Sequence, residues 1–209
     1  MHMIIDALEQ SWRAWADLGG SLDESGWQRP TRLPGWTVKD VYAHCSGFPA
    51  ATRAGLAAEE PDGPVTHADA AELLAFMQRP GGIAHEAADQ LRDEAVRQAT
   101  ATPAEQLVAQ FAEVAPGLIA SLRNANLDRR VDYGGFAVVT AAEALRIFTM
   151  EAVVHYFDMA TALDLAVPGP MAGAPLRATV RLLADTADPV AFVDAATGRG
   201  TPSVFPVLR

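Results

Sequence analysis

The sequence has a single cysteine, Cys45, and far fewer basic than acidic residues. One cysteine excludes an internal disulfide, and this scarcity is typical of proteins from a reducing compartment. Sixteen lysines and arginines stand against 26 aspartates and glutamates, which leaves a net charge of −10. Because phosphate recognition needs a basic stripe, no nucleic-acid partner is expected. The same deficit argues against docking on an anionic membrane surface.

Long apolar runs and several common site motifs are also missing. Acids, arginines or prolines interrupt every run before it reaches 18 apolar residues, so no membrane span is predicted. Residues 1–6 lack the basic and long apolar regions of a signal peptide. No glycine-rich phosphate loop, dinucleotide fingerprint or Gly-x-Ser-x-Gly nucleophile elbow is present. We therefore predict a soluble, cytoplasmic protein without these common chemistries.

What the sequence does contain is alanine-rich segments whose apolar residues recur at helical spacing. Thr37 with Asp40, and Thr140 with Glu143, have the spacing of a capping box, which marks the start of a helix. The predicted fold is mainly α, a bundle of four main helices over residues 4–20, 37–48, 104–122 and 140–165. Pro116 should kink the third of them. The four tryptophans are expected to pack this bundle: Trp12, Trp15, Trp27 and Trp36.

The Pro168-Gly169-Pro170 segment is predicted to link two parts of the chain. We expect a helical bundle over residues 1–167 and a short C-terminal α/β extension over 168–209, packed on the bundle. The extension should hold one helix near 174–184 and a strand-like tail. The strand-like pieces are expected at Val190–Val193 and Ser203–Leu208, on either side of a turn at 197–200. Residues 124–135 are interpreted as a connecting loop.

Glu151 and His155 form the most informative pair in the chain. Four residues apart on a helix, a carboxylate and an imidazole stack on one face, about 6 Å apart. His44, at the end of another predicted helix, offers a second imidazole. Three such ligands can hold a divalent metal and leave a fourth position open, as catalytic sites do. The alternative is a Glu151–His155 hydrogen bond across one helical turn, with His44 an ordinary core or surface histidine.

Three residues near these candidates have interpretations of their own. Asp40 is interpreted as the acid of a first helical turn, where the helix dipole favours it. Asp158 is either an acceptor that orients the His155 imidazole or part of a solvated helix face. Cys45 directly follows His44, and consecutive helical residues point about 100° apart. It is therefore interpreted as a small buried hydrophobe and not as a second ligand.

Two segments resemble the signatures of a known family. Trp27 and residues 30–44 (PTRLPGWTVKDVYAH) resemble the opening signature of the mycothiol-dependent maleylpyruvate isomerase family. Residues 151–163 (EAVVHYFDMATAL) resemble its second signature, and the tail from residue 197 is similar to that of many relatives. The family belongs to the DinB-like metal-binding four-helix bundles, so the resemblance implies that fold here.

The resemblance also implies a site and a chemistry. The family's metal triad falls on His44, Glu151 and His155, with zinc the usual ion and nickel an alternative. The family uses the thiol of a low-molecular-weight cofactor such as mycothiol, which the cation keeps as the nucleophilic thiolate. In an isomerase the thiolate adds to an activated cis double bond, and the adduct rotates and eliminates to the trans product. Related bundles transfer the thiol to a small electrophilic substrate.

The C-terminal part leaves the function open. Only about fifty residues follow His155, fewer than in the isomerase, whose C-terminal domain helps form the substrate pocket. Arg177, Arg181 and Arg199 are candidate substrate-binding residues by charge alone. Besides a thiol-dependent isomerase or transferase, a metal-dependent enzyme with hydrolytic, eliminating or specialised-metabolite chemistry is possible. A non-catalytic small-molecule binding or stress protein is the third alternative. The apolar content would permit a homodimer.

Overall fold

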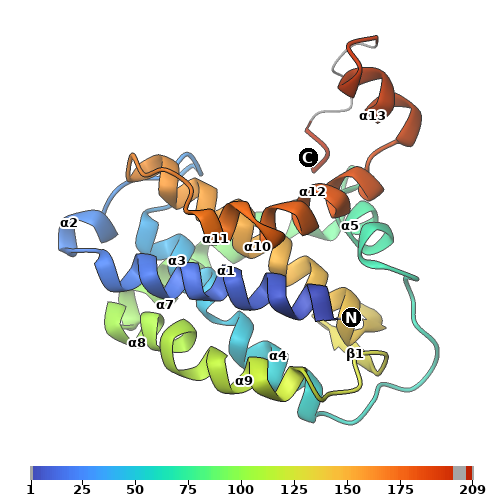
Figure 1. Ribbon diagram of the computed structural model, residues 1–209, viewed down its shortest axis with the longest axis horizontal. Coiled ribbons are helices and arrows are strands. Elements are labelled where there is room, and N and C mark those ends of the chain that lie inside the picture. The colour runs from blue at the N-terminus through green and yellow to red at the C-terminus, as the bar shows by residue number, and fades with distance from the viewer. Residues whose placement is uncertain (1, 200–205, 209) are drawn as a thin grey trace.

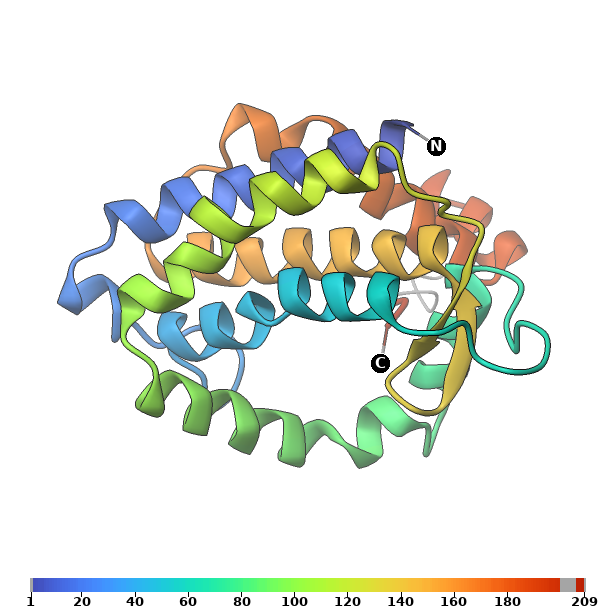
Figure 2. The same ribbon diagram turned by 90° about the horizontal axis from the view of Figure 1, so that it is seen from below.

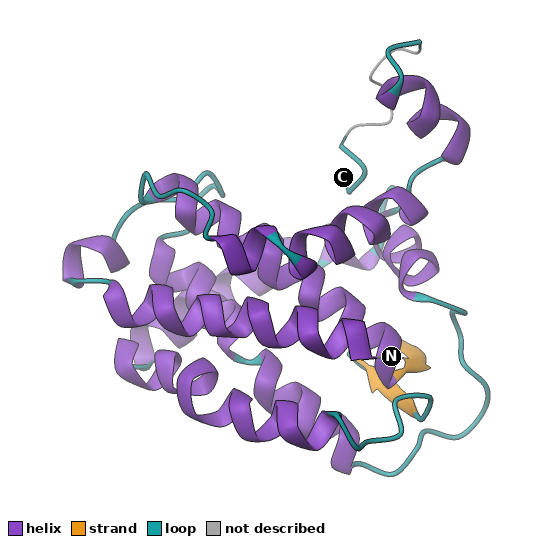
Figure 3. Ribbon diagram, viewed as in Figure 1, coloured by secondary structure: helices purple, strands orange, loops and turns teal. Residues whose placement is uncertain are grey.

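The computed structural model describes residues 2–199 and 206–208, and these are mainly helical (Figure 1, Figure 3). Helix α10 packs against α1, α3 and α4, and Figure 2 shows it running alongside α4 and α1. The predicted mainly α four-helix bundle is therefore confirmed. Its four members are α1 (His2–Ser21), α3 (Val38–Ser46) continued by α4 (Phe48–Ala57), the run α8 (Ala104–Ala109), η1 (Gln110–Val114) and α9 (Ala115–Leu122), and α10 (Ala141–Ala162).

Shorter helices surround the bundle. Helix α7 packs on α3, and α12 packs on both α1 and α10. These outer elements are α2 (Glu24–Trp27), α5 (Ala70–Gln78), α6 (Ile83–Glu86), α7 (Ala88–Ala101), α11 (Gly169–Ala172), α12 (Ala174–Thr186) and α13 (Pro189–Ala196). The helix predicted near 174–184 is thus present as α12. Within the described residues, every helix is too short or too polar to cross a membrane.

The prediction of a strand at Val190–Val193 is wrong, because these residues lie inside α13. The Asp188 carboxylate accepts a hydrogen bond from the Ala191 amide (2.8 Å), and Pro189 occupies the first helical position. A side-chain cap followed by proline starts a helix, and this local signal overrides the β-prone composition of the next four residues. The second piece begins at 203–205, which lie outside the described residues, as does the end of the predicted turn at Gly200.

A β-hairpin occupies much of the segment that we interpret as a loop. Strands β1 (Arg130–Tyr133) and β2 (Ala137–Thr140) pair antiparallel and pack on α10, and β1 also touches α4. Gly134 and Gly135, with φ of 67° and 77°, form the turn, a conformation that glycine adopts without strain. Each strand has only four residues, too few for an alternating pattern to stand out. The loop interpretation is therefore wrong at residues 130–133, which form β1, whereas 134 and 135 are the turn of the hairpin.

The helices that carry the site residues begin at side-chain caps. In α3 the predicted capping box is present, since the Asp40 carboxylate accepts from the Thr37 amide (2.7 Å) and Thr37 Oγ1 accepts from the Asp40 amide (3.3 Å). In α10 only half of the box forms. Thr140 accepts from the Glu143 amide, but the Glu143 carboxylate binds the Ala70 amide at the start of α5. One cap residue thereby joins two helices.

The third bundle helix is interrupted where proline requires it. The π-helical turn η1 ends two residues before Pro116. Proline has no amide hydrogen for a regular helical bond, and a wider turn accommodates that loss. The irregularity predicted for this helix is thus located at residues 110–114.

Aromatic residues fix α1 against its neighbours. The Trp15 indole donates to the Ala152 carbonyl of α10 (2.9 Å), and the Tyr42 hydroxyl of α3 donates to the Trp15 carbonyl (2.9 Å). At Gly19 a Cβ atom would lie 2.5 Å from the Tyr42 hydroxyl oxygen, so only glycine allows this approach. Trp12, Trp15 and Trp27 are buried as predicted, whereas Trp36 is only partly buried.

Candidate metal centre

Helices α3 and α10 bring the three predicted ligands together. Nε2 of His155 lies 3.2 Å from Oε2 of Glu151, one helical turn away on α10. The His44 ring, on α3, stands nearly perpendicular to the His155 ring, with their centroids 5.3 Å apart. His155 therefore links Glu151, on its own helix, to His44, more than a hundred residues earlier in the chain. Among the described residues, the donor atoms that all lie within 4.8 Å of one another are those of His44, Cys45 and His155, and Glu151 reaches this group through its contact with His155.

Asp158 orients the His155 ring. Its Oδ2 accepts from Nδ1 of His155 (2.9 Å), and its Oδ1 accepts from Nε of Arg32 (2.6 Å). With only 2% of its surface exposed, Asp158 does not belong to a solvated helix face. Because the carboxylate holds Nδ1, Nε2 is the nitrogen that faces Glu151. Arg32, in the loop before α3, is a site residue that the sequence reasoning missed, although it lies in the segment that resembles the family's opening signature.

The pKa values of the two imidazoles are shifted in opposite directions. Burial opposes the charged form of His155, but hydrogen bonds with Asp158 and Glu151 outweigh it and raise the His155 pKa to about 9. Burial, assisted by the His155 charge, lowers the pKa of His44 to about 4. The pKa of Glu151 is lowered despite its burial, mainly because of the hydrogen bond with His155. Near neutral pH, His44 is thus neutral, with a lone pair for a ligand, beside an ionised carboxylate.

The Cys45 thiol lies closer to the two imidazoles than the 100° angle between consecutive helical residues suggests. Its Sγ and one ring nitrogen each from His44 and His155 all lie within 4.8 Å of one another. Burial raises the pKa of the thiol well above its usual range, and no part of the residue is exposed. Cys45 is therefore buried, as predicted, but it is also a third donor atom beside the two imidazoles, which the helix-angle argument did not anticipate.

The donor set fits a divalent metal of the zinc type. Two nitrogen or oxygen ligands at about 2.1 Å from a tetrahedral zinc are about 3.4 Å apart, and the His155–Glu151 distance is close to this. Imidazole, carboxylate and thiolate are all zinc ligands, while nickel also suits imidazole. A separation of 3.2 Å also fits a direct hydrogen bond between His155 and Glu151, which is the alternative interpretation of this pair.

Aromatic rings cover the centre. The Trp36 ring stacks on His155, with the planes 13° apart, and meets His44 edge-on. Phe48, at the start of α4, contacts His44 from another side and stacks on Phe148 of α10, with centroids 4.9 Å apart. Trp36, expected only to pack the bundle, therefore also forms a wall of the site.

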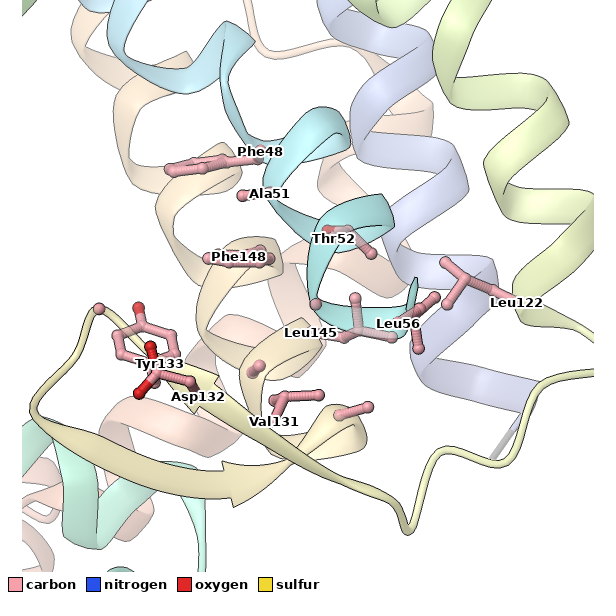
Figure 4. Close-up of a pocket in the computed structure, with 14 residues that line it drawn as sticks. Phe48, Ala51, Thr52, Leu56, Leu122, Val131, Asp132, Tyr133, Leu145 and Phe148 are labelled. Atoms are coloured by element: carbon pink, nitrogen blue, oxygen red, sulfur yellow. The ribbon is translucent and has the colours of Figure 1, made fainter. Parts of the chain in front are cut away.

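A cavity of about 300 Å³ opens beside these rings, between α4, α10 and the β-hairpin (Figure 4). Phe48, whose ring contacts His44, and Phe148 both line it, and Tyr133 of β1 lies alongside Phe148 (Figure 4). Burial, reinforced by the charge of Glu151, raises the pKa of Tyr133. At neutral pH its hydroxyl is consequently a neutral donor.

The three candidate arginines do not reach this region. Arg177 and Arg181 are exposed on α12, and Arg199 is exposed after α13. None of the three lines the cavity. Arg32 is instead the arginine that the fold brings to the centre.

Fold and site together define a helical-bundle protein with a partly buried imidazole–carboxylate centre. The family described as mycothiol maleylpyruvate isomerase N-terminal domain matches residues 8–160, and the chain belongs to this family. No curated protein matches the chain.

Two solved structures share the fold. The mycothiol-dependent maleylpyruvate isomerase has a TM-score of 0.56 and 15% identity over 97% of this chain and 77% of its own. A histidine-to-alanine variant of that enzyme has the same TM-score and coverage, at 14% identity. At such identities the likeness shows the fold alone, and it confirms the predicted DinB-like bundle.

Proposed function

We propose that this protein is a divalent-metal-dependent isomerase or S-transferase that uses a mycothiol-type thiol on a small electrophilic substrate. The observation that supports the proposal is the contact of His155 with both Glu151 and the His44 ring inside the bundle of this family. We assign these three residues as the ligands of the ion, with zinc as the expected metal. A reducing compartment, the cytoplasm, is the expected location because the family's cofactor works as a free thiol.

The residues around the ligands would prepare the site. A bound divalent ion would lower the pKa of a coordinating thiol and so supply the nucleophilic thiolate. Asp158 holds the proton on Nδ1 of His155 and leaves Nε2 as the ligand atom, and Arg32 fixes the Asp158 carboxylate. Trp36 and Phe48 limit the access of water, which strengthens every charge interaction inside.

Metal content tests the ligand set. We would measure it by plasma mass spectrometry on wild-type protein and on four alanine variants at His44, Cys45, Glu151 and His155. We expect about one divalent ion per chain in the wild type and in Cys45→Ala, and loss of the ion in the other three. The exposed His85→Ala is the control and should keep the ion.

Two results would change this assignment. Loss of the ion in Cys45→Ala together with retention in Glu151→Ala would move the third ligand from the carboxylate to the thiol. No ion in the wild type, even after reconstitution with zinc or nickel, would contradict a metal enzyme and favour a binding function.

Turnover tests the thiol. Consumption of an activated cis alkene by the metal-loaded protein should require an added low-molecular-weight thiol and should disappear in His155→Ala. Metal-dependent turnover without any thiol would instead indicate hydrolytic or eliminating chemistry on the same bundle.

A further inference from the structure

We infer that the cavity beside the metal centre binds a neutral, largely apolar molecule whose single polar group accepts a hydrogen bond from Tyr133. The inference deepens the proposed function and rests on it in one respect, because it names the class of the electrophilic substrate. It makes a dicarboxylate a poor occupant.

The size and walls of the cavity favour an apolar occupant. Its volume of about 300 Å³ is at the lower end of the range for small-molecule sites. Figure 4 shows aromatic and aliphatic side chains around it, and Leu122 at the end of α9 is one of them. Phe48 and Leu56 come from α4, Val131 from β1, and Leu145 and Phe148 from α10. Contact between such walls and an apolar molecule is favourable, because it removes apolar surface from water. These apolar side chains provide no polar partner for a charged group.

The charges near the cavity disfavour an anion. None of the fourteen lining residues is basic, and the single ionisable acid among them is Asp132, whose carboxylate accepts from the Gly135 amide in the hairpin turn. The nearby Arg129 guanidinium donates to the carbonyls of Leu56 and Ala58, and Arg129 does not line the cavity. A carboxylate entering this cavity would lose its hydration without gaining a cation.

Tyr133 supplies the polar contact. Its hydroxyl forms no hydrogen bond with any residue that the structure describes. Its ring stacks on Phe148, with centroids 6.0 Å apart, and Figure 4 shows the hydroxyl pointing away from the hairpin. Phe148 lies one helical turn before Glu151 on α10, so Tyr133 contacts the turn of this helix that precedes the proposed ligand. A phenol donates to a carbonyl oxygen, the group that activates a neighbouring double bond.

A matched pair of unreactive ligands tests the charge preference. We would titrate 4-phenylbutan-2-one and 3-phenylpropanoate, which differ in a methyl group against a carboxylate oxygen, and follow binding by NMR. In protein stripped of metal with a chelator, and shown by circular dichroism to remain folded, the ketone should bind about 100-fold more tightly or better. Equal affinity of the two ligands in this state would overturn the inference.

Variants locate the binding site. Ala51 and Ala54 are both exposed on α4, but only Ala51 lines the cavity. Ala51→Trp should abolish ketone binding, and Ala54→Trp should leave it unchanged. Tyr133→Phe should weaken the ketone about fivefold and leave butylbenzene, which has no oxygen, unaffected. Ketone binding that persists in Ala51→Trp would refute the assignment of this cavity.

The outcome is separable from that of the proposed function. Ketone affinity in metal-free protein reports on the cavity, and metal content of the same samples reports on His44, Glu151 and His155. Preference for the carboxylate only after metal loading would place the anion on the ion and exclude a neutral substrate.

Discussion

The charge of Asp158 should contribute to both stability and metal affinity. The residue is almost completely buried, yet it accepts hydrogen bonds from His155 and Arg32. Asp158→Asn keeps the shape of the side chain and removes the charge. Because the His155 pKa is about 9, the ring is protonated at pH 7 in metal-free protein, and the lost contact is a charge-assisted hydrogen bond.

The expected loss of stability depends on how exposed the two hydrogen-bond partners of Asp158 are. A hydrogen bond to a charged group contributes about 1.5–3 kcal/mol when buried. The His155 side chain is 16% exposed, so its bond keeps most of that value, whereas Arg32 is 55% exposed and contributes little through solvent screening. We expect a loss of about 2 kcal/mol in the unfolding free energy, or roughly 4–8 °C in Tm. Metal affinity should fall about 10- to 100-fold, because the ligand ring loses its orienting partner.

Urea denaturation of metal-free protein at pH 7 measures the first effect, and competition with a chelator of known zinc affinity measures the second. Asp164→Asn is the matched control, since Asp164 is 86% exposed in its pair with Arg29 and should change either quantity little. An Asp158→Asn protein with wild-type metal affinity would refute the positioning role of Asp158.

Three further predictions concern pH and packing. The folded pKa of His155 lies above its unfolded value of about 6.5, so its stabilisation is complete below about pH 6.5 and is lost as the pH rises towards 9. Metal-free wild type should lose up to about 3 kcal/mol over this range by urea denaturation, and His155→Gln should lack this alkaline decline. Thr52→Val removes a buried hydroxyl that has no hydrogen-bond partner among the described residues, so the thermal unfolding midpoint should stay unchanged or rise. A clear decrease would show that the hydroxyl does form a hydrogen bond. Gly19→Ala should destabilise by about 1–3 kcal/mol because its Cβ would meet Tyr42, whereas Gly20→Ala, which meets nothing, should stabilise the helix slightly; equal effects would contradict the packing at Gly19.

Elements with long, local signals were predictable from the sequence. The capping box of Thr37 and Asp40 and the helical start at Thr140 use contacts between residues three apart, so the pattern is visible in the chain itself. The Glu151–His155 pair is local for the same reason. Where signals were short or in conflict, prediction failed: the four-residue strands at 130–133 and 137–140 were missed, and the cap at Asp188 made a helix of a β-prone segment. The division at residue 167 and the homodimer remain predictions.

By itself, the sequence determined the bundle helices and placed a carboxylate and an imidazole on one face of α10, because helical periodicity fixes which neighbours share a face. Only the tertiary structure decided that His44 and Cys45 approach His155, and that Arg32 holds Asp158 across 126 positions of chain. The apolar cavity between α4, α10 and the hairpin likewise exists only after packing. Such contacts depend on how helices cross and how loops return to them, and no spacing along the chain encodes that geometry.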